Sequence, residues 1–163
     1  TQRQDFIEKG RPYALRLDLK EALKQIDYRP LHWHDRIKGK QDPTPDLLLK
    51  MIGDVVLARK DTPASYHLCV THDDALQGLN LITRGEDLFF ATHLHRLLQE
   101  LFLYPVPEYH HHPLLTDKNG RRLAKRDKSL TLREIRNKGF QPEELSVMIT
   151  QNDFATLLSE TTP

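Results

Sequence analysis

A Gly-led stretch at residues 120–129 (GRRLAKRDKS) places five basic side chains within eight positions. They are Arg121, Arg122, Lys125, Arg126 and Lys128. Cations on a loop can close over a polyphosphate and stabilise the charge that develops when a group is transferred from it. A run of charges of this kind can equally be a solvated surface loop. The residues around the stretch must therefore decide between a phosphate-binding loop and a plain surface loop.

Positive charge is concentrated in this part of the chain. The net charge is only +1, so the whole molecule offers no electrostatic case for binding nucleic acid. Residues 118–138 hold nine Lys or Arg and two acids, whereas residues 140–163 hold four acids and no Lys or Arg. Any electrostatic case for nucleic-acid binding therefore depends on this basic segment.

Carboxylate and histidine pairs are the other candidates for chemistry. Asp73 and Asp74 form one acidic pair, and such pairs serve in acid–base catalysis or bind metal ions. Histidines recur at 32 and 34, 93 and 95, and 110–112, which invites a zinc hypothesis. Cys69 is the single cysteine, and no second ligand pair has a standard spacing, so no metal site is expected in this chain. A lone cysteine also fits a reducing cytoplasm. No apolar run is long enough to span a membrane.

Strands and helices alternate along the sequence, which predicts an α/β fold with an irregular or antiparallel addition at the front. Apolar residues at helical spacing predict a long helix over 88–102, ended by Pro105. Asp18 and Glu21 have the spacing of a capping box and predict a short helix over 19–26. Residues 39–46 and 117–120 are predicted as a loop and a turn. The remaining predictions are strands at 12–19, 31–37, 53–59, 65–71, 79–83 and 109–115, and helices at 130–137 and 142–150.

Five short motifs follow one another in an order that resembles a known family. They are Tyr66-His67-Leu68, Asp73-Asp74, Thr83-Arg84-Gly85-Glu86-Asp87-Leu88, His112-Pro113-Leu114-Leu115 and Arg122-Leu123-Ala124-Lys125-Arg126. The series resembles the second half of the catalytic domain of the class I glutamyl-tRNA synthetases. It looks most like the short branch of glutamyl-queuosine tRNA(Asp) synthetases. The resemblance runs over about residues 53–129 and more loosely beyond.

The resemblance implies a role for the basic stretch. Arg122 to Arg126 match the family's KMSKS signature, whose second lysine contacts the ATP phosphates, so Lys125 is the predicted catalytic residue. A lysine suits this task as a mobile point charge. Arg122 keeps the charge of the signature's first lysine and is predicted to bind ATP as well. Ala124 replaces the usual serine and removes a hydroxyl donor, which affects the tuning of loop closure.

The resemblance also implies the substrate sites. Tyr66 and Arg84 match the residues that hold glutamate, and a guanidinium with a phenol suits a carboxylate. Without the resemblance, Tyr66 reads as a strand-packing aromatic and Arg84 as a surface cation. Glu86, Leu114 and Leu115 match the ATP-binding residues, although the leucines alone read as core residues. Asp73 and Asp74 match positions that face the acceptor end of tRNA.

The implied fold is the second half of a Rossmann-like nucleotide-binding domain, with the tail of an inserted domain before it and short helices after it. The corresponding division is 1–62 for the end of the inserted region, 63–116 for the Rossmann-like half, and 117–163 for the KMSKS-type loop and C-terminal helices. The family's HIGH signature is missing, so the chain is expected to be inactive alone. The family's zinc site, where present, is expected to lie before Thr1. The family's large anticodon-binding region is missing after residue 126, which favours the queuosine branch.

The implied function is that of an ATP-dependent ligase that joins L-glutamate to tRNA. Its cofactors are ATP and the accompanying Mg²⁺, and its favoured acceptor is queuosine of tRNA(Asp), with tRNA(Glu) as the alternative. A fragment of an ordinary glutamyl-tRNA synthetase and a tRNA-binding module without catalysis remain rival hypotheses. A plain interaction domain with a solvated basic loop is a third.

Overall fold

The computed structural model describes residues 2–114 and 131–150, in two compact units that divide after His112. The described part of the second unit holds α6 (Leu132–Asn137) and α7 (Pro142–Thr150). The first unit contains α1 (Gln2–Glu8), β1 (Ala14–Leu17), α2 (Leu19–Gln25), β2 (Trp33–Asp35), β3 (Gly39–Gln41), α3 (Pro45–Met51), β4 (Val55–Arg59), α4 (Tyr66–Leu76), β5 (Leu81–Gly85), the 3-10 turn η1 (Glu86–Leu88), α5 (Phe89–Phe102) and β6 (Glu108–His112).

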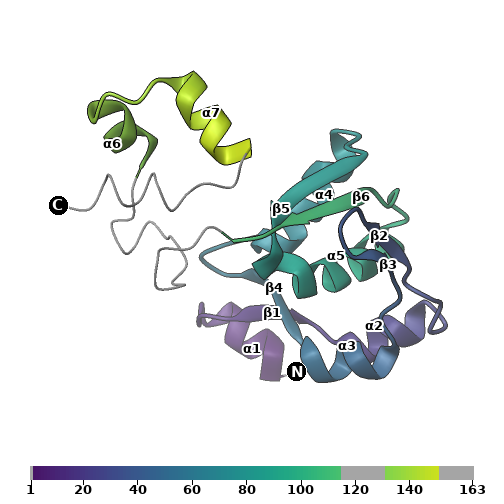
Figure 1. Ribbon diagram of the computed structural model, residues 1–163. Helices are drawn as coiled ribbons and strands as arrows, with labels where there is room; N and C mark the ends of the chain where they lie inside the picture. The colour runs from purple at the N-terminus through teal and green to yellow at the C-terminus, as the bar shows by residue number, and fades with distance from the viewer. Residues whose placement is uncertain (1, 115–130, 151–163) are drawn as a thin grey trace. The chain divides into compact units, whose positions relative to one another are not determined.

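A four-stranded sheet in the order β3-β2-β6-β5 forms the centre of the first unit. Strand β6 is parallel to both of its neighbours, β5 and β2, whereas β3 is antiparallel to β2. Helix α5 connects β5 to β6, and α4 packs beside it (Figure 1). Parallel strands joined through a helix are the hallmark of an α/β fold, so the predicted class is confirmed.

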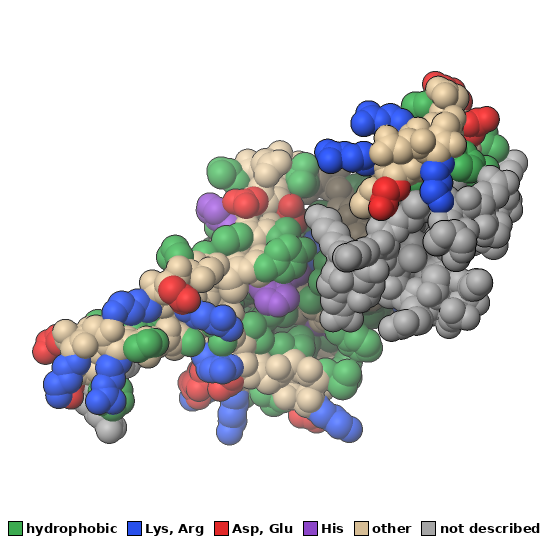
Figure 2. All heavy atoms as spheres, turned by 90° about the vertical axis from the view of Figure 1, so that its left-hand side faces the viewer, with side chains coloured by type: hydrophobic (Ala, Val, Ile, Leu, Met, Phe, Trp, Pro, Cys, Tyr) green, Lys and Arg blue, Asp and Glu red, His purple; other side chains and the backbone are tan. Residues whose placement is uncertain are grey.

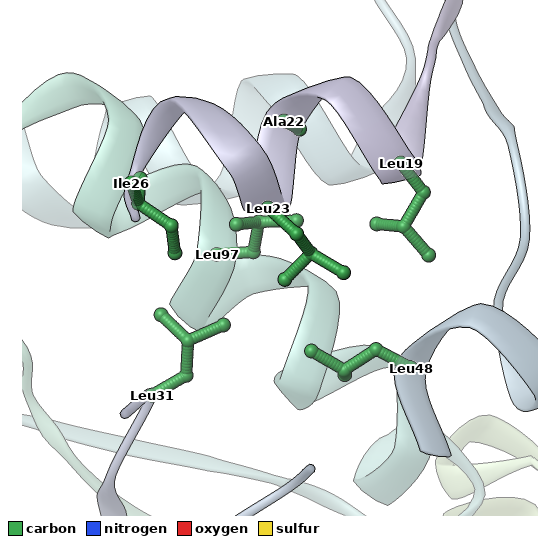
Figure 3. Close-up of a cluster of buried hydrophobic side chains, with 7 residues drawn as sticks. All are labelled: Leu19, Ala22, Leu23, Ile26, Leu31, Leu48 and Leu97. Atoms are coloured by element: carbon green, nitrogen blue, oxygen red, sulfur yellow. The ribbon is translucent and has the colours of Figure 1, made fainter. Parts of the chain in front are cut away.

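Seven buried aliphatic side chains hold α2, α3 and α5 together (Figure 3). Leu97 of α5 is fully buried and meets Leu23 of α2 and Leu48 of α3 in this cluster. The other members are Leu19, Ala22, Ile26 and Leu31. Burying one such side chain contributes about 1.5–3 kcal/mol. This cluster therefore anchors α2 and α3, while β1 and β4 form a separate antiparallel pair beside them.

Asp35 makes a fully buried polar link between β2 and β6. Its Oδ2 accepts from the ring Nδ1 of His111 at 2.6 Å and from the backbone N–H of His111 at 3.1 Å. Its Oδ1 accepts from the backbone N–H groups of Ile37 and Lys38 at 2.9 and 2.8 Å. Burial raises the pKa of Asp35, but the hydrogen bonds from His111 and the backbone outweigh burial and lower it overall. One carboxylate thus satisfies four donors at the centre of the sheet.

Two of the predicted elements are wrong, and helix caps explain both. Residues 65–71 form the start of helix α4 rather than a strand, because the Ser65 hydroxyl accepts from the N–H of Leu68 and begins a helix. The predicted loop at 39–46 contains strand β3 and the start of α3, where Thr44 caps the helix and Pro45 occupies its first turn. β-branched and apolar composition favoured a strand in the first case, and two prolines favoured a loop in the second.

The other described predictions are confirmed in type, and their ends differ from the observed bounds by no more than a few residues. Asp18 caps α2 by accepting from the N–H of Glu21 at 3.0 Å. Helix α5 ends at Leu103, which has a left-handed φ of 57°, two residues before Pro105. In the second unit, Thr131 and Glu134 form a reciprocal capping box at the start of α6. The turn predicted at 117–120 lies outside the described residues, and the division of the chain at 62 and 116 stays a prediction.

Candidate functional site

Tyr66 is the first residue of α4, where the cap at Ser65 places it. Its side chain is 53% exposed, so it does not pack in a core as a strand residue would. One edge of its ring contacts two histidines, with ring centroids 5.6 Å from His67 and 6.3 Å from His95. The phenol therefore rests on a histidine pair and remains accessible from solvent.

Arg84 lies on β5, and its guanidinium is buried rather than on the surface. Its Nη1 is 2.8 Å from Nδ1 of His95, and its Nη2 is 3.8 Å from Oδ2 of Asp74. The guanidinium carbon lies 5.1 Å from the ring centroid of Tyr109, a distance at which a cation is attracted to the ring face. The sequence-based alternative of a surface cation is therefore wrong for Arg84.

Tyr66 and Arg84, eighteen positions apart in sequence, meet the same buried histidine. His95 is 1% exposed. Its Nδ1 contacts the Arg84 guanidinium, and its ring lies at a steep angle to the Tyr66 ring. The structure thus brings the two predicted glutamate-binding residues around one side chain. Helix α5 supplies His95, strand β5 supplies Arg84 and the N-terminus of α4 supplies Tyr66.

The donor and the acceptor of each hydrogen bond at His95 can be assigned. A guanidinium only donates, so Nδ1 of His95 must accept. Burial, with the nearby Arg84 charge, lowers the pKa of His95 to about 3, which leaves the ring neutral with its proton on Nε2. That proton faces Nδ1 of His67 at 3.0 Å, so His67 accepts in turn. Donation therefore runs from Arg84 to His95 to His67.

The low pKa of His95 predicts that the folded protein loses stability in acid. An unfolded histidine binds a proton near pH 6.5, whereas folded His95 binds one only near pH 3. Between these values the unfolded state holds more protons, so the free energy of unfolding rises with pH and falls as pH drops below 6.5. Urea unfolding at pH 7 and pH 5 is expected to show this fall, with a smaller fall in His95→Gln. His72→Gln, an exposed control, is expected to keep the wild-type difference; an unchanged difference in His95→Gln would contradict the prediction.

The paired carboxylates Asp73 and Asp74 have different surroundings. Asp73 is exposed on α4, whereas Asp74 is partly buried and faces Arg84. Burial raises the pKa of Asp74, and the Arg84 charge opposes this shift. Asp74 therefore belongs to the Arg84 cluster, and only Asp73 of the pair is fully open to a partner.

The predicted ATP-binding residues are only partly within the described chain. Glu86 is exposed in η1, directly after β5 and before α5. Leu114 is half-buried in the second unit. Leu115, Arg122 and Lys125 lie outside the described residues, so their roles stay predictions. On the face that Figure 2 shows, described Lys and Arg side chains lie among Asp and Glu in both units, and neither sign gathers in one patch.

Histidines account for the residues that sequence reasoning missed. His95 entered the sequence analysis only in the zinc hypothesis and His67 only within a motif, yet both contact Tyr66, and His95 also contacts Arg84. A signal was present, because His95 lies four residues after Ala91 and three before Leu98, on the buried face of α5. A polar residue on such a face needs a polar partner.

Neither a metal site nor a membrane span is found in the described chain. His110 and His112 share a face of β6, opposite Tyr109 and His111. No three His, Cys, Asp or Glu side chains of residues 2–114 and 131–150 gather as metal ligands do. Within the same residues, every helix is too short or too polar to cross a membrane.

Comparison with known proteins identifies the family. Residues 1–156 match the family described as tRNA synthetases class I (E and Q), catalytic domain, and the chain belongs to this family. A glutamate tRNA ligase from Elizabethkingia meningosepticum, crystallised in complex with its amino acid, aligns with a TM-score of 0.57 and 27% identity. That alignment covers 77% of this chain and 23% of the other. The fold is that of a class I synthetase, as predicted.

Relatives with two different names are similar to this chain in sequence. A glutamyl-Q tRNA(Asp) synthetase from Rhodobacter capsulatus is 42% identical over 87% of this chain and 53% of its own length. One from Nocardia farcinica is 38% identical over 88% of this chain and 42% of its own. A glutamate–tRNA ligase from Finegoldia magna is 35% identical over 85% of this chain and 26% of its own. The chain thus spans about half the length, or less, of these relatives.

Proposed function

We propose that the protein carrying this chain activates L-glutamate with ATP and transfers it to tRNA. In the first step a glutamate carboxylate oxygen attacks the α-phosphate of ATP, giving glutamyl-adenylate and pyrophosphate. In the second step a hydroxyl of the tRNA takes the glutamyl group, and AMP leaves. Membership of the class I tRNA synthetase family (E and Q) over residues 1–156 carries this proposal.

The geometry of Tyr66 and Arg84 supports glutamate as the amino acid. The buried Arg84 guanidinium and the accessible Tyr66 phenol both contact His95, and together they offer a carboxylate a charged donor and a directional hydroxyl. Asp74 balances the charge of Arg84, with Oδ2 of Asp74 3.8 Å from Nη2 of Arg84. This distance is longer than a hydrogen bond, so we infer that the N–H groups of Nη2 can donate to glutamate. Catalysis of this kind depends mainly on holding the reactants together and stabilising charge.

The basic residues are proposed to act on ATP. Lys125, with Arg122, contacts the phosphates, and Mg²⁺ that enters with ATP shares their charge. Glu86, Leu114 and Leu115 hold the adenosine. Glu86 is exposed at the carboxyl end of β5, the edge where ligands of open parallel sheets bind.

Queuosine of tRNA(Asp) is the acceptor that we propose. The two relatives with 42% and 38% identity carry the name glutamyl-Q tRNA(Asp) synthetase, and they support this choice. The 35% identical glutamate–tRNA ligase supports tRNA(Glu) as the second candidate.

The test uses the full-length protein that carries this chain. We expect glutamate-dependent exchange between ATP and pyrophosphate without tRNA, followed by labelling of queuosine-modified tRNA(Asp) and not of tRNA(Glu). tRNA(Asp) without queuosine is the matched control and is expected to stay unlabelled. Labelling of tRNA(Glu) alone would replace the queuosine proposal by the second candidate. Binding of tRNA with neither exchange nor labelling would favour a tRNA-binding module.

A further inference from the structure

The guanidinium of Arg84 is held on several sides by residues of the first unit. His95 takes one N–H of Nη1 at 2.8 Å, and the Tyr109 ring lies 5.1 Å from the guanidinium carbon. Asp74 balances the charge from 3.8 Å. Of these three contacts, only the one to His95 is a directional hydrogen bond that fixes the fork in its plane.

His95 is itself held in place. Its Nε2 is 3.0 Å from Nδ1 of His67, so the ring cannot turn over without losing both hydrogen bonds. The Tyr66 ring packs edge-on against both histidines, at 5.6 and 6.3 Å between ring centroids. A single pair of histidines thus supports both residues that are proposed to bind glutamate.

We propose that His95, locked by His67, is a positioning residue that aims the Arg84 guanidinium at the carboxylate of bound glutamate. This inference rests on the proposed function. An arginine side chain has several rotatable bonds, and a fork that is not fixed must be ordered again each time it binds a ligand. The acceptor at Nδ1 removes that cost before glutamate arrives. Because the contact is made before glutamate binds, its loss is expected to weaken binding of the ground state and of the transition state alike.

Three substitutions at one position separate positioning from packing. An Asn amide places its oxygen near the site of Nδ1, facing Arg84, whereas a Gln amide reaches the site of Nε2, facing His67. In the full-length protein, His95→Ala is expected to raise the KM for glutamate in ATP–pyrophosphate exchange by about tenfold or more. His95→Gln is expected to raise it by a similar factor. His95→Asn is expected to stay within about threefold of wild type, and kcat is expected to change little in all three.

Two further variants provide an upper limit and a control. Arg84→Lys keeps the charge but lacks the fork, and it sets the upper limit of the effect. His72→Asn removes an exposed histidine that also makes a hydrogen bond, to the Tyr104 hydroxyl at 2.7 Å, and is expected to leave the KM unchanged. Urea unfolding of every variant shows whether it is folded at the assay temperature. If His95→Ala does not fold, the comparison of Asn with Gln still decides the question.

Nuclear magnetic resonance of ¹⁵N-histidine-labelled full-length protein provides a readout that is independent of activity. The proposal requires His95 to carry its proton on Nε2, and the opposite tautomer would overturn it. Equal KM values for His95→Asn and His95→Gln would also overturn the positioning role, with the proposed function intact. Absence of any glutamate-dependent exchange in the wild type would overturn the proposed function first, so the two failures are distinguishable.

Discussion

Asp35→Ala is expected to lower the free energy of unfolding of the chain by about 3–5 kcal/mol, because several hydrogen-bond donors lose their acceptor and each buried one costs about 1–3 kcal/mol. Asp35 is fully buried and accepts four hydrogen bonds, two of them from His111. Its loss removes the acceptor of the buried backbone N–H of His111 and of the part-buried N–H groups of Ile37 and Lys38. Urea unfolding monitored through Trp33, two residues away on β2, measures the change.

The chain contains a matched control for this substitution. Asp42 pairs with His32 through the same atom types, at 2.9 Å between Nδ1 and Oδ1, but both side chains are about half exposed. Asp42→Ala is expected to change stability by less than about 1 kcal/mol. Comparable losses in the two variants would mean that burial does not set the value of the Asp35 link.

Lys125→Ala is expected to slow glutamyl-adenylate formation by about 100-fold or more in the full-length protein, the usual cost of removing a group that stabilises transition-state charge. Lys125 lies outside the described residues, and its role follows from the match of residues 122–126 to the KMSKS signature. Binding of tRNA is expected to weaken far less, since one lysine supplies only one of many phosphate contacts. Single-turnover adenylate formation and tRNA binding at fixed salt measure the two effects.

Lys128→Ala provides the control within the same basic stretch. It removes the same charge three residues beyond Lys125, outside the signature. We expect it to leave adenylate formation within about threefold of wild type. A similar slowing in both variants would mean that the stretch acts through its total charge, and equal losses of adenylate formation and tRNA binding would contradict the role of Lys125.

Secondary structure was predictable where apolar residues repeat with a single regular spacing. Apolar residues recur at helical spacing along helix α5, and its prediction is confirmed almost to the residue. Helix α4 was missed because it is weakly amphipathic and rich in residues that favour strands, so its cap at Ser65 was the decisive signal. The start of helix α3 was predicted as a loop because of Pro43 and Pro45, although Pro45 begins the helix instead of preventing it.

Candidate members of the site could be proposed from the sequence, but their arrangement could not. Matching motifs selected Tyr66 and Arg84, and the structure brings both to His95. Their spacing in sequence carries no information on depth, so the burial of Arg84 could not be foreseen. The roles of His67 and His95 depend on contacts between α4, α5 and β5, which only the tertiary fold supplies.

Helix α5 carries buried polar side chains that bond to three different strands. His93 accepts from the Trp33 indole of β2, His95 bonds to Arg84 of β5, and Gln99 donates to the Tyr109 hydroxyl of β6. An apolar helix can slide along a sheet by small steps, but a slide here would break all of these bonds together. The helix and the sheet must therefore move as one rigid body. Any movement that accompanies binding of the proposed substrate is therefore expected outside this helix and sheet.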